Sequence, residues 1–460
     1  MKPSARCLAL LVGLGCATGG TPPRSSLPVP TGGAPARVVL VSVAGLTPAV
    51  YGAGDGRSMP WLRALAVAGV EAEAVAPVAP SDVYPAHATL ITGELPARHG
   101  VPANQLLGEA GVRAATYSHA SFVRVPTLWQ RAREARLPVA SFDWPTTVGA
   151  AIDLLLPDVV PVRRDQSWVE LLEDTATPAL VERVRATGPG DVPGPERDRL
   201  LVGLACEALG SSVAPRLVLL RLSQSEAPLA RFGPGSAEAR AAFASIDREL
   251  GRLLDCLRAA GRLEDGALVV VGDRGFLPVH TRVNPNRALG EAGLLSQAGA
   301  SSWKAIVRTN GGSAFVYASD ENSAIRARSV LEDLAERTRA FRVVSAQEML
   351  DVGGDPEAWF ALEATPGVVF ADGEGRALVE PAARRGASGY LPDDAELYPG
   401  FVAWGRGLRR GVRIPWMRQS DVAPTLAALL GLELAPRDGR ALVGVLDLQG
   451  TPPVGTRPGR

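Results

Sequence analysis

The segment RVVLVSV at residues 37–43 is dominated by β-branched and other apolar residues. A strand buried on both faces of a parallel sheet has this composition, whereas a strand with one wet face alternates apolar and polar residues. Two similar runs, PRLVLLRLS at 215–223 and ALVVVGD at 267–273, occur later in the chain. We therefore expect all three to be core strands of a mostly parallel sheet.

Segments with helical spacing alternate with these strands. PWLRALAVAGV at 60–70 and TLWQRAREARLP at 127–138 are two of them, and VASFDWP at 139–145 is a further strand. The segment at 238–261 is long and amphipathic, as expected of a helix that covers a sheet. This alternation predicts an α/β fold, layered α/β/α, with helices on both faces of the sheet.

Between about residues 281 and 372 the regular alternation of strands and helices stops. Short predicted strands surround one helical segment at 322–340. We interpret this region as a smaller α+β insertion. In open α/β sheets, ligands bind outside the carboxyl ends of the strands. The candidate site is therefore expected at Ala44, at residues 224–230 and at Asp273-Arg274.

The N-terminus has the features of an export signal. Lys2 and Arg6 precede an apolar stretch from Leu8 to Leu14, which is too short to span a bilayer. The residues before Cys16 resemble a bacterial lipobox, and a plain cleaved signal is the alternative. We expect an exported protein of the bacterial cell envelope, attached to a membrane by a lipid anchor only. The predicted division is a signal at 1–16, a flexible linker at 17–35, a domain at 36–435 and a tail at 436–460.

The balance of charge argues against nucleic-acid binding, and the sequence context of two cysteines predicts their state. Basic and acidic residues each number 48, so the chain lacks the strong positive charge typical of nucleic-acid capture, and we expect no nucleic-acid partner. Cys206 and Cys256 lie in apolar helical segments. We expect them to be two buried thiols, and a disulfide is the alternative in an oxidising compartment.

Residues 80–93 read PSDVYPAHATLITG. This segment resembles the nucleophile segment of the type I phosphodiesterase/nucleotide pyrophosphatase family, in the alkaline phosphatase superfamily, whose usual text is P-[ST]-x-T-[YF]-P-[NA]-H-x-T-L-x-T-G. The inner threonine of that pattern is the family's nucleophile and a zinc ligand. Val83 stands at this position. A valine side chain has no oxygen to attack phosphorus or to bind a metal.

Further segments resemble the family's zinc-binding segments, in the same order, so that the resemblance covers about residues 36–435. It implies an alkaline-phosphatase-like core and a site for two zinc ions. The positions that correspond to the remaining zinc ligands are Ala44, Glu226, Ala230, Asp273, Arg274 and Ser388. Only Asp273 is unchanged, and Glu226 replaces an aspartate. Because a zinc site needs at least three protein ligands, we expect these two residual metal-binding residues to be insufficient and no cofactor to be bound.

Arg274 stands where the family has a histidine. We expect it to form a bidentate ion pair with Asp273 and so to supply positive charge in place of zinc. A solvent-facing Arg274 is the alternative. Such a pocket would bind a phosphate-containing or other anionic ligand through Arg274 and Asn104. The resemblance places Asn104 at a phosphate-contacting position, and an ordinary turn-capping asparagine is the alternative.

Two functions are compatible with these residues. The first is a pseudoenzyme, that is, a phosphodiesterase-like protein that has lost its nucleophile and zinc site and acts in binding or as a scaffold. The alternative is an active phosphoric ester hydrolase with a rebuilt site, made from Glu226, Asp273, Ser81 or Asp82, and His280. Ser81 would share a face with Val83 only on an extended segment. His87 and His99 are expected to be structural.

Overall fold

The computed structural model describes residues 27–29, 31–52, 58–108, 111–161, 166–188, 192, 194–295, 303–371 and 377–448. The expected signal, most of the expected linker and the end of the predicted tail lie outside the described residues. Within the described ranges, no helix has the length and apolar character needed to cross a membrane.

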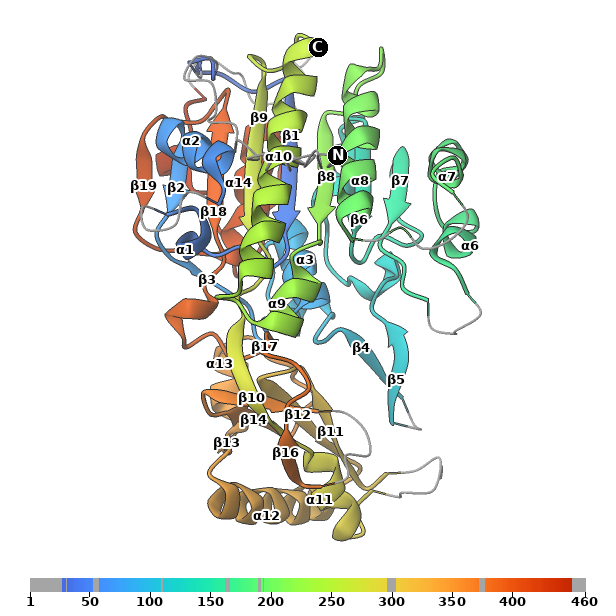
Figure 1. Ribbon diagram of the computed structural model, residues 1–460, viewed down its shortest axis with the longest axis vertical. Helices are drawn as coiled ribbons and strands as arrows, with labels where there is room; N and C mark the ends of the chain where they lie inside the picture. The colour runs from blue at the N-terminus through green and yellow to red at the C-terminus, as the bar shows by residue number, and fades with distance from the viewer. Residues whose placement is uncertain are drawn as a thin grey trace, which may run out of the picture.

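A twisted sheet forms the centre of the protein (Figure 1). In the described part of the chain its eight strands have the order β19 (Val412–Ile414), β2 (Val70–Ala72), β18 (Phe401–Gly405), β9 (Gly266–Gly272), β1 (Arg37–Val43), β8 (Leu217–Leu222), β6 (Val139–Trp144) and β7 (Leu154–Pro157). Strand β1 pairs in parallel with both β8 and β9, and β18 is antiparallel to β9. The three strands predicted from their apolar runs therefore lie side by side in the middle of a mostly parallel sheet.

Helices cover both faces of this sheet. The face that carries Val39 and Val41 packs against α2 (Pro60–Ala68), α8 (Gly194–Gly210) and α10 (Ala237–Ala259). The opposite face, which carries Val38 and Leu40, packs against α3 (Val83–Thr92), α5 (Leu128–Glu134) and α14 (Val422–Leu430). Alternate side chains of one strand thus enter two different cores, which explains why β1 carries apolar residues at successive positions from Val38 to Val41. The predicted layered α/β/α class is confirmed.

Short elements connect these layers. The helices are α1 (Pro48–Tyr51), α4 (Pro96–His99), α6 (Trp168–Glu173), α7 (Pro178–Arg185) and α9 (Glu226–Phe232). The strands are the pairs β3 (Val75–Ala76) with β20 (Met417–Arg418), and β4 (Gln105–Gly108) with β5 (Gly111–Thr116). Helix α9 matters most for the site, because it begins directly after the loop that leaves β8.

A smaller α+β part lies below the carboxyl ends of β1, β8 and β9 in Figure 1. One antiparallel sheet has the order β11 (Ala305–Thr309), β12 (Ser313–Ala318), β14 (Phe360–Ala364) and β13 (Phe341–Val344). It packs against α12 (Glu321–Thr338) through residues such as Val316, Leu331 and Leu362. Strands β10 (Leu277–Val283), β15 (Gly367–Phe370), β16 (Val379–Pro381) and β17 (Gly386–Ala387), with helices α11 (Pro285–Glu291) and α13 (Ala346–Asp351), complete this part.

The expectation of two buried thiols is wrong. Cys206 of α8 and Cys256 of α10 form a disulfide, and both residues are partly exposed. The two helices lie next to each other on the same face of the sheet, and they bring the Cα atoms to 5.5 Å, a usual separation for a disulfide. Sequence context showed that both segments were apolar helices, but it did not show that the helices were neighbours.

Candidate functional site

A cleft of about 1050 Å³ lies where the carboxyl ends of the central strands meet the smaller α+β part. Arg221, Glu226 and Arg274 line it on the side of the sheet, and Asn310 and Phe370 line it on the opposite side. This is the place at which open α/β sheets collect their ligand-binding residues. Glu226, Ala230 and Arg274, which follow β8 and β9 in the chain, all line this cleft.

Val83, at the nucleophile position, is the first residue of α3 and lines the cleft. Asp82 caps this helix, because its carboxylate accepts a hydrogen bond of 2.9 Å from the N–H of Val83. The valine side chain is 6% exposed. The structure thus presents a hydrocarbon surface where a nucleophile would be needed.

Arg274 is the centre of a cluster of side chains at positions that the family resemblance assigns to zinc ligands. Its guanidinium pairs with Asp273, donates to Oε1 of Glu226 at 2.7 Å, and donates from Nε to the Ser388 hydroxyl at 3.2 Å. The expected contact with Asp273 is present, but it is not bidentate, because the two arms of the fork go to different carboxylates. Burial alone would lower the pKa of Arg274, but the carboxylates of Asp273 and Glu226 outweigh this and raise the pKa above its ordinary value.

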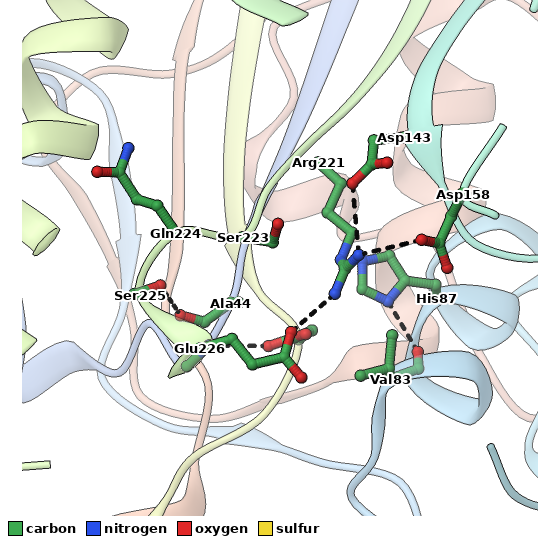
Figure 2. A network of polar contacts seen from close by, with 12 residues as sticks. Ala44, Val83, His87, Asp143, Asp158, Arg221, Ser223, Gln224, Ser225 and Glu226 are labelled. Atoms are coloured by element: carbon green, nitrogen blue, oxygen red, sulfur yellow. Dashed lines mark hydrogen bonds and ion pairs between the residues drawn. The ribbon is translucent and has the colours of Figure 1, made fainter. Parts of the chain in front are cut away.

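Arg221 is a second buried arginine of the cleft, and the sequence analysis missed it. Its Nη2 donates to Oε2 of Glu226 at 2.9 Å, while Nη1 lies 3.5 Å from Asp143 and 3.6 Å from Asp158 (Figure 2). Tyr84 also donates to Asp158, at 2.8 Å. A signal for this residue was available, because Arg221 is the only charged residue in the otherwise apolar strand LVLLRL.

The donor set does not fit a pair of zinc ions. Asp273 is fully buried and accepts from the N–H of Gly45 at 2.9 Å, and both it and Glu226 are already neutralised by arginine. Ala44 and Ala230 have no side-chain donor atom. Across the described residues there is no group of three or more His, Cys, Asp and Glu placed to hold a metal ion.

Asn104 lines the cleft, but its side-chain oxygen is engaged in a hydrogen bond. The amide oxygen accepts a hydrogen bond of 3.0 Å from the N–H of Tyr84, in the first turn of α3. Asn104 therefore acts as a link between the loop and the helix that carries Val83.

The residues of the rebuilt hydrolase do not all meet. Asp82 and Glu226 line the cleft, whereas Ser81 is fully buried and is not among the residues described as lining it. His280 is exposed, and its Nδ1 lies 2.8 Å from the hydroxyl of the neighbouring Thr281. His280 is likewise outside the described lining of the cleft. The structure thus places Asp82 and Glu226 at the cleft and leaves Ser81 and His280 outside its described lining.

The other histidines have structural contacts. His87 is buried, its Nδ1 lies 2.8 Å from the Val83 carbonyl oxygen, and its ring meets the Trp144 ring edge-on at 4.9 Å (Figure 2 shows His87 beside Val83). His99 is also buried and lies 3.1 Å from the Thr89 hydroxyl. Burial lowers the pKa of His99 to about 3, so that it is neutral at physiological pH.

Asp143 stands behind Arg221 in an unusual conformation. Its φ of 57° lies in the left-handed region, and its side chain is fully buried. Burial raises the pKa of Asp143 from 3.8 to about 7, although Arg197 and Arg221 favour the charged form. Because the folded state binds this proton more tightly than the unfolded state, the stabilisation is complete below about pH 4 and is lost as the pH rises through about 7.

We expect Asp143→Asn to flatten this part of the pH dependence. Asparagine tolerates the left-handed conformation and resembles the protonated carboxyl group. Between pH 5 and pH 8 the free energy of unfolding should fall less in the variant than in the wild type, by about 1–3 kcal/mol, as measured by urea denaturation. The exposed Asp255→Asn is the control and should follow the wild type. Parallel curves for Asp143→Asn and the wild type would contradict the assignment.

A family model and two curated relatives match the sequence of this chain. A sequence model described as type I phosphodiesterase/nucleotide pyrophosphatase matches residues 38–385. Ectonucleotide pyrophosphatase/phosphodiesterase family member 1 of the mouse, Mus musculus, is 23% identical over 226 residues, which are 48% of this chain and 22% of that protein. The same protein of the rat, Rattus norvegicus, matches with the same identity and coverage. The match therefore spans about a fifth of the length of these curated relatives.

Solved structures show the same architecture. Murine ectonucleotide pyrophosphatase/phosphodiesterase 5, in an inactive form in complex with AMP, superposes with a TM-score of 0.65 at 18% sequence identity, over 89% of this chain and 99% of that chain. The human protein of the same name gives a TM-score of 0.65 at 18% identity, over 89% of this chain and 100% of that chain. At this identity the likeness establishes the shared fold.

Proposed function

This chain belongs to the type I phosphodiesterase/nucleotide pyrophosphatase family, and we propose that it is a member that has lost hydrolytic activity. In this proposal the protein acts in binding or as a scaffold, and its cleft receives a phosphate-containing or other anionic ligand. The observation that carries the proposal is the position of Arg274. Its guanidinium lies among Asp273, Glu226 and Ser388, which are the positions that the family resemblance assigns to zinc ligands.

The loss of hydrolysis follows from two separate deficits. A covalent mechanism needs a nucleophile, and Val83 offers none. Metal-assisted hydrolysis needs cations that activate the nucleophile and neutralise the phosphoryl charge, and the carboxylates of Asp273 and Glu226 are instead held by arginines. A guanidinium neutralises charge, but it does not generate a hydroxide nucleophile.

The charge of the cleft supports an anionic ligand. Among the described residues that line it, six are arginines and three are carboxylates. The arginines are Arg197, Arg221, Arg231, Arg274, Arg282 and Arg384, and the carboxylates are Asp82, Asp158 and Glu226. An excess of arginine on a concave surface attracts anions and matches the geometry of carboxylate and phosphate groups.

We also propose that the protein functions outside the cytoplasm, at the bacterial cell envelope, as a lipoprotein anchored through Cys16. The Cys206–Cys256 disulfide supports export, because disulfides persist in oxidising compartments and are rare in the cytosol. The lipobox-like sequence that ends at Cys16 supports the anchor.

The purified protein is expected to contain less than one zinc ion per chain after incubation with zinc and dialysis. It is also expected to hydrolyse bis-(p-nitrophenyl) phosphate no faster than a protein-free blank. Elemental analysis and absorbance of released nitrophenol are the two measurements. Two zinc ions per chain, or turnover that disappears in Asp273→Asn, would overturn the proposal.

A revertant provides the positive control for this assay. It restores the family's residues through the substitutions Ala44→Asp, Val83→Thr, Glu226→Asp, Ala230→His, Arg274→His and Ser388→His. If the frame of the site is intact, this variant should bind zinc where the natural chain does not. The comparison separates the loss of ligands from a loss of the fold.

A further inference from the structure

Glu226 bridges the two buried arginines of the cleft. Its Oε1 accepts from Nη2 of Arg274 at 2.7 Å, and its Oε2 accepts from Nη2 of Arg221 at 2.9 Å. In Figure 2 the Arg221 guanidinium points at the Glu226 carboxylate from above. One carboxylate therefore joins two cations that come from different parts of the sheet, the carboxyl-terminal end of β8 and the loop that follows β9.

The two guanidinium groups together make a geometry that suits an oxyanion. The Arg274 side chain is 2% exposed and the Arg221 side chain is 7% exposed, so both charges are held in place by packing. Each guanidinium donates one N–H group to a different oxygen of the Glu226 carboxylate, and these two oxygens are bonded to one carbon atom. A carboxylate, phosphate or sulfate presents two oxygens in this way, and such charge-assisted hydrogen bonds are strong at buried sites.

Glu226 differs from the other acids of the cluster in its exposure to the cleft. Its side chain is 38% exposed, whereas those of Asp143 and Asp273 are fully buried. It lines a cleft of about 1050 Å³, next to the small side chains of Ala227 and Ala230. The Glu226 side chain therefore borders open space in the cleft, whereas the two arginine side chains are enclosed.

We propose that Arg221 and Arg274 form an oxyanion-binding site, and that Glu226 closes this site as an internal competing ligand. An external oxyanion with two oxygens on one central atom displaces the Glu226 carboxylate and takes over both hydrogen bonds. This inference rests on the proposed binding function of the cleft and names its binding residues and its regulation. The external anion replaces the carboxylate of Glu226, so Arg221 and Arg274 keep an anionic partner. The exchange is therefore compatible with the buried Asp143, Asp158 and Asp273 nearby.

The test is the affinity of Glu226→Ala for simple oxyanions. Inorganic phosphate and acetate are titrated separately into the full-length wild type and the variant by calorimetry, at constant ionic strength maintained with sodium chloride. The variant should bind at least one of the two oxyanions about tenfold more tightly than the wild type, which corresponds to about 1.4 kcal/mol. The two titrations distinguish a phosphate-selective site from a carboxylate-selective one. Equal affinities of the wild type and the variant for both anions would overturn the proposal.

Glu71→Ala is the matched control. Glu71 also bridges two arginines, Arg63 at 3.0 Å and Arg413 at 2.8 Å, but it lies on β2 and outside the described lining of the cleft. This variant should gain no affinity. A gain equal to that of Glu226→Ala would show that any released arginine pair binds anions, and would overturn the assignment.

Glu226→Gln provides a second variant that preserves the volume of the side chain. It keeps one oxygen to accept a hydrogen bond, so its gain in affinity should be smaller than that of Glu226→Ala but in the same direction. If Glu226→Ala does not fold, as judged by circular dichroism, the result for Glu226→Gln decides. Zinc binding or hydrolysis by the wild type would overturn only the proposed loss of hydrolytic activity. Unchanged anion affinity in both variants would overturn only the proposed oxyanion site.

Discussion

Replacing Arg274 with alanine is expected to lower the free energy of unfolding by about 3–5 kcal/mol, because the change leaves buried charge without a partner. Asp273 is fully buried and would lose the guanidinium that it pairs with, and Glu226 would lose one of its two arginines. The measurement is urea denaturation at pH 7, followed by tryptophan fluorescence and by circular dichroism.

Two further variants show whether the loss comes from the buried pair. Arg131→Ala removes an exposed arginine that pairs with Glu134 at 2.9 Å, and it should change stability by less than about 1 kcal/mol. The double variant Asp273→Asn with Arg274→Ala removes both charges and should recover part of the loss. A loss below about 1 kcal/mol for Arg274→Ala would indicate that the cluster is solvated and would contradict the structure.

The sequence predicted the fold well because the apolar pattern reports burial directly. Strand β1 is apolar at successive positions since its two faces enter two cores, and β9 shows the same pattern. The position of the site followed from the fold, because Asp273 and Arg274 come directly after β9, at its carboxyl end. The contacts of Arg274 with Glu226 and Ser388 were not predicted individually, although the family pattern placed all of these residues in one site.

Contacts between segments that are distant in the chain could not be predicted from local sequence patterns. Arg221 was overlooked because its partners, Asp143 and Asp158, lie on or after other strands, and only the order of β8, β6 and β7 in the sheet brings them together. The bidentate pair expected between Arg274 and Asp273 failed for a similar reason. Glu226, 48 residues earlier in the chain, takes one arm of the guanidinium.

The arginines also explain why the remaining carboxylates are tolerated in a cleft that lacks the family's zinc ligands. Asp273 and Glu226 would repel each other if they were buried without a counterion. Arg274 and Arg221 supply the positive charge, and Glu226 is shared between them. The charge balance of the site is thus maintained by side chains of the chain itself.

The double variant Cys206→Ser with Cys256→Ser is expected to lower the free energy of unfolding by about 4 kcal/mol, on the chain-entropy account of a loop of this size. The cysteines are 50 residues apart in the sequence, so the disulfide restricts the unfolded chain over the whole segment between α8 and α10. Urea denaturation without a reductant measures the effect, and the reduced wild type should unfold at nearly the same concentration as the variant. Because α8 and α10 cover one face of the sheet and neither cysteine is among the described cleft-lining residues, phosphate affinity should stay unchanged. Equal stability of the oxidised wild type and the variant would show that the two thiols do not pair in the folded protein.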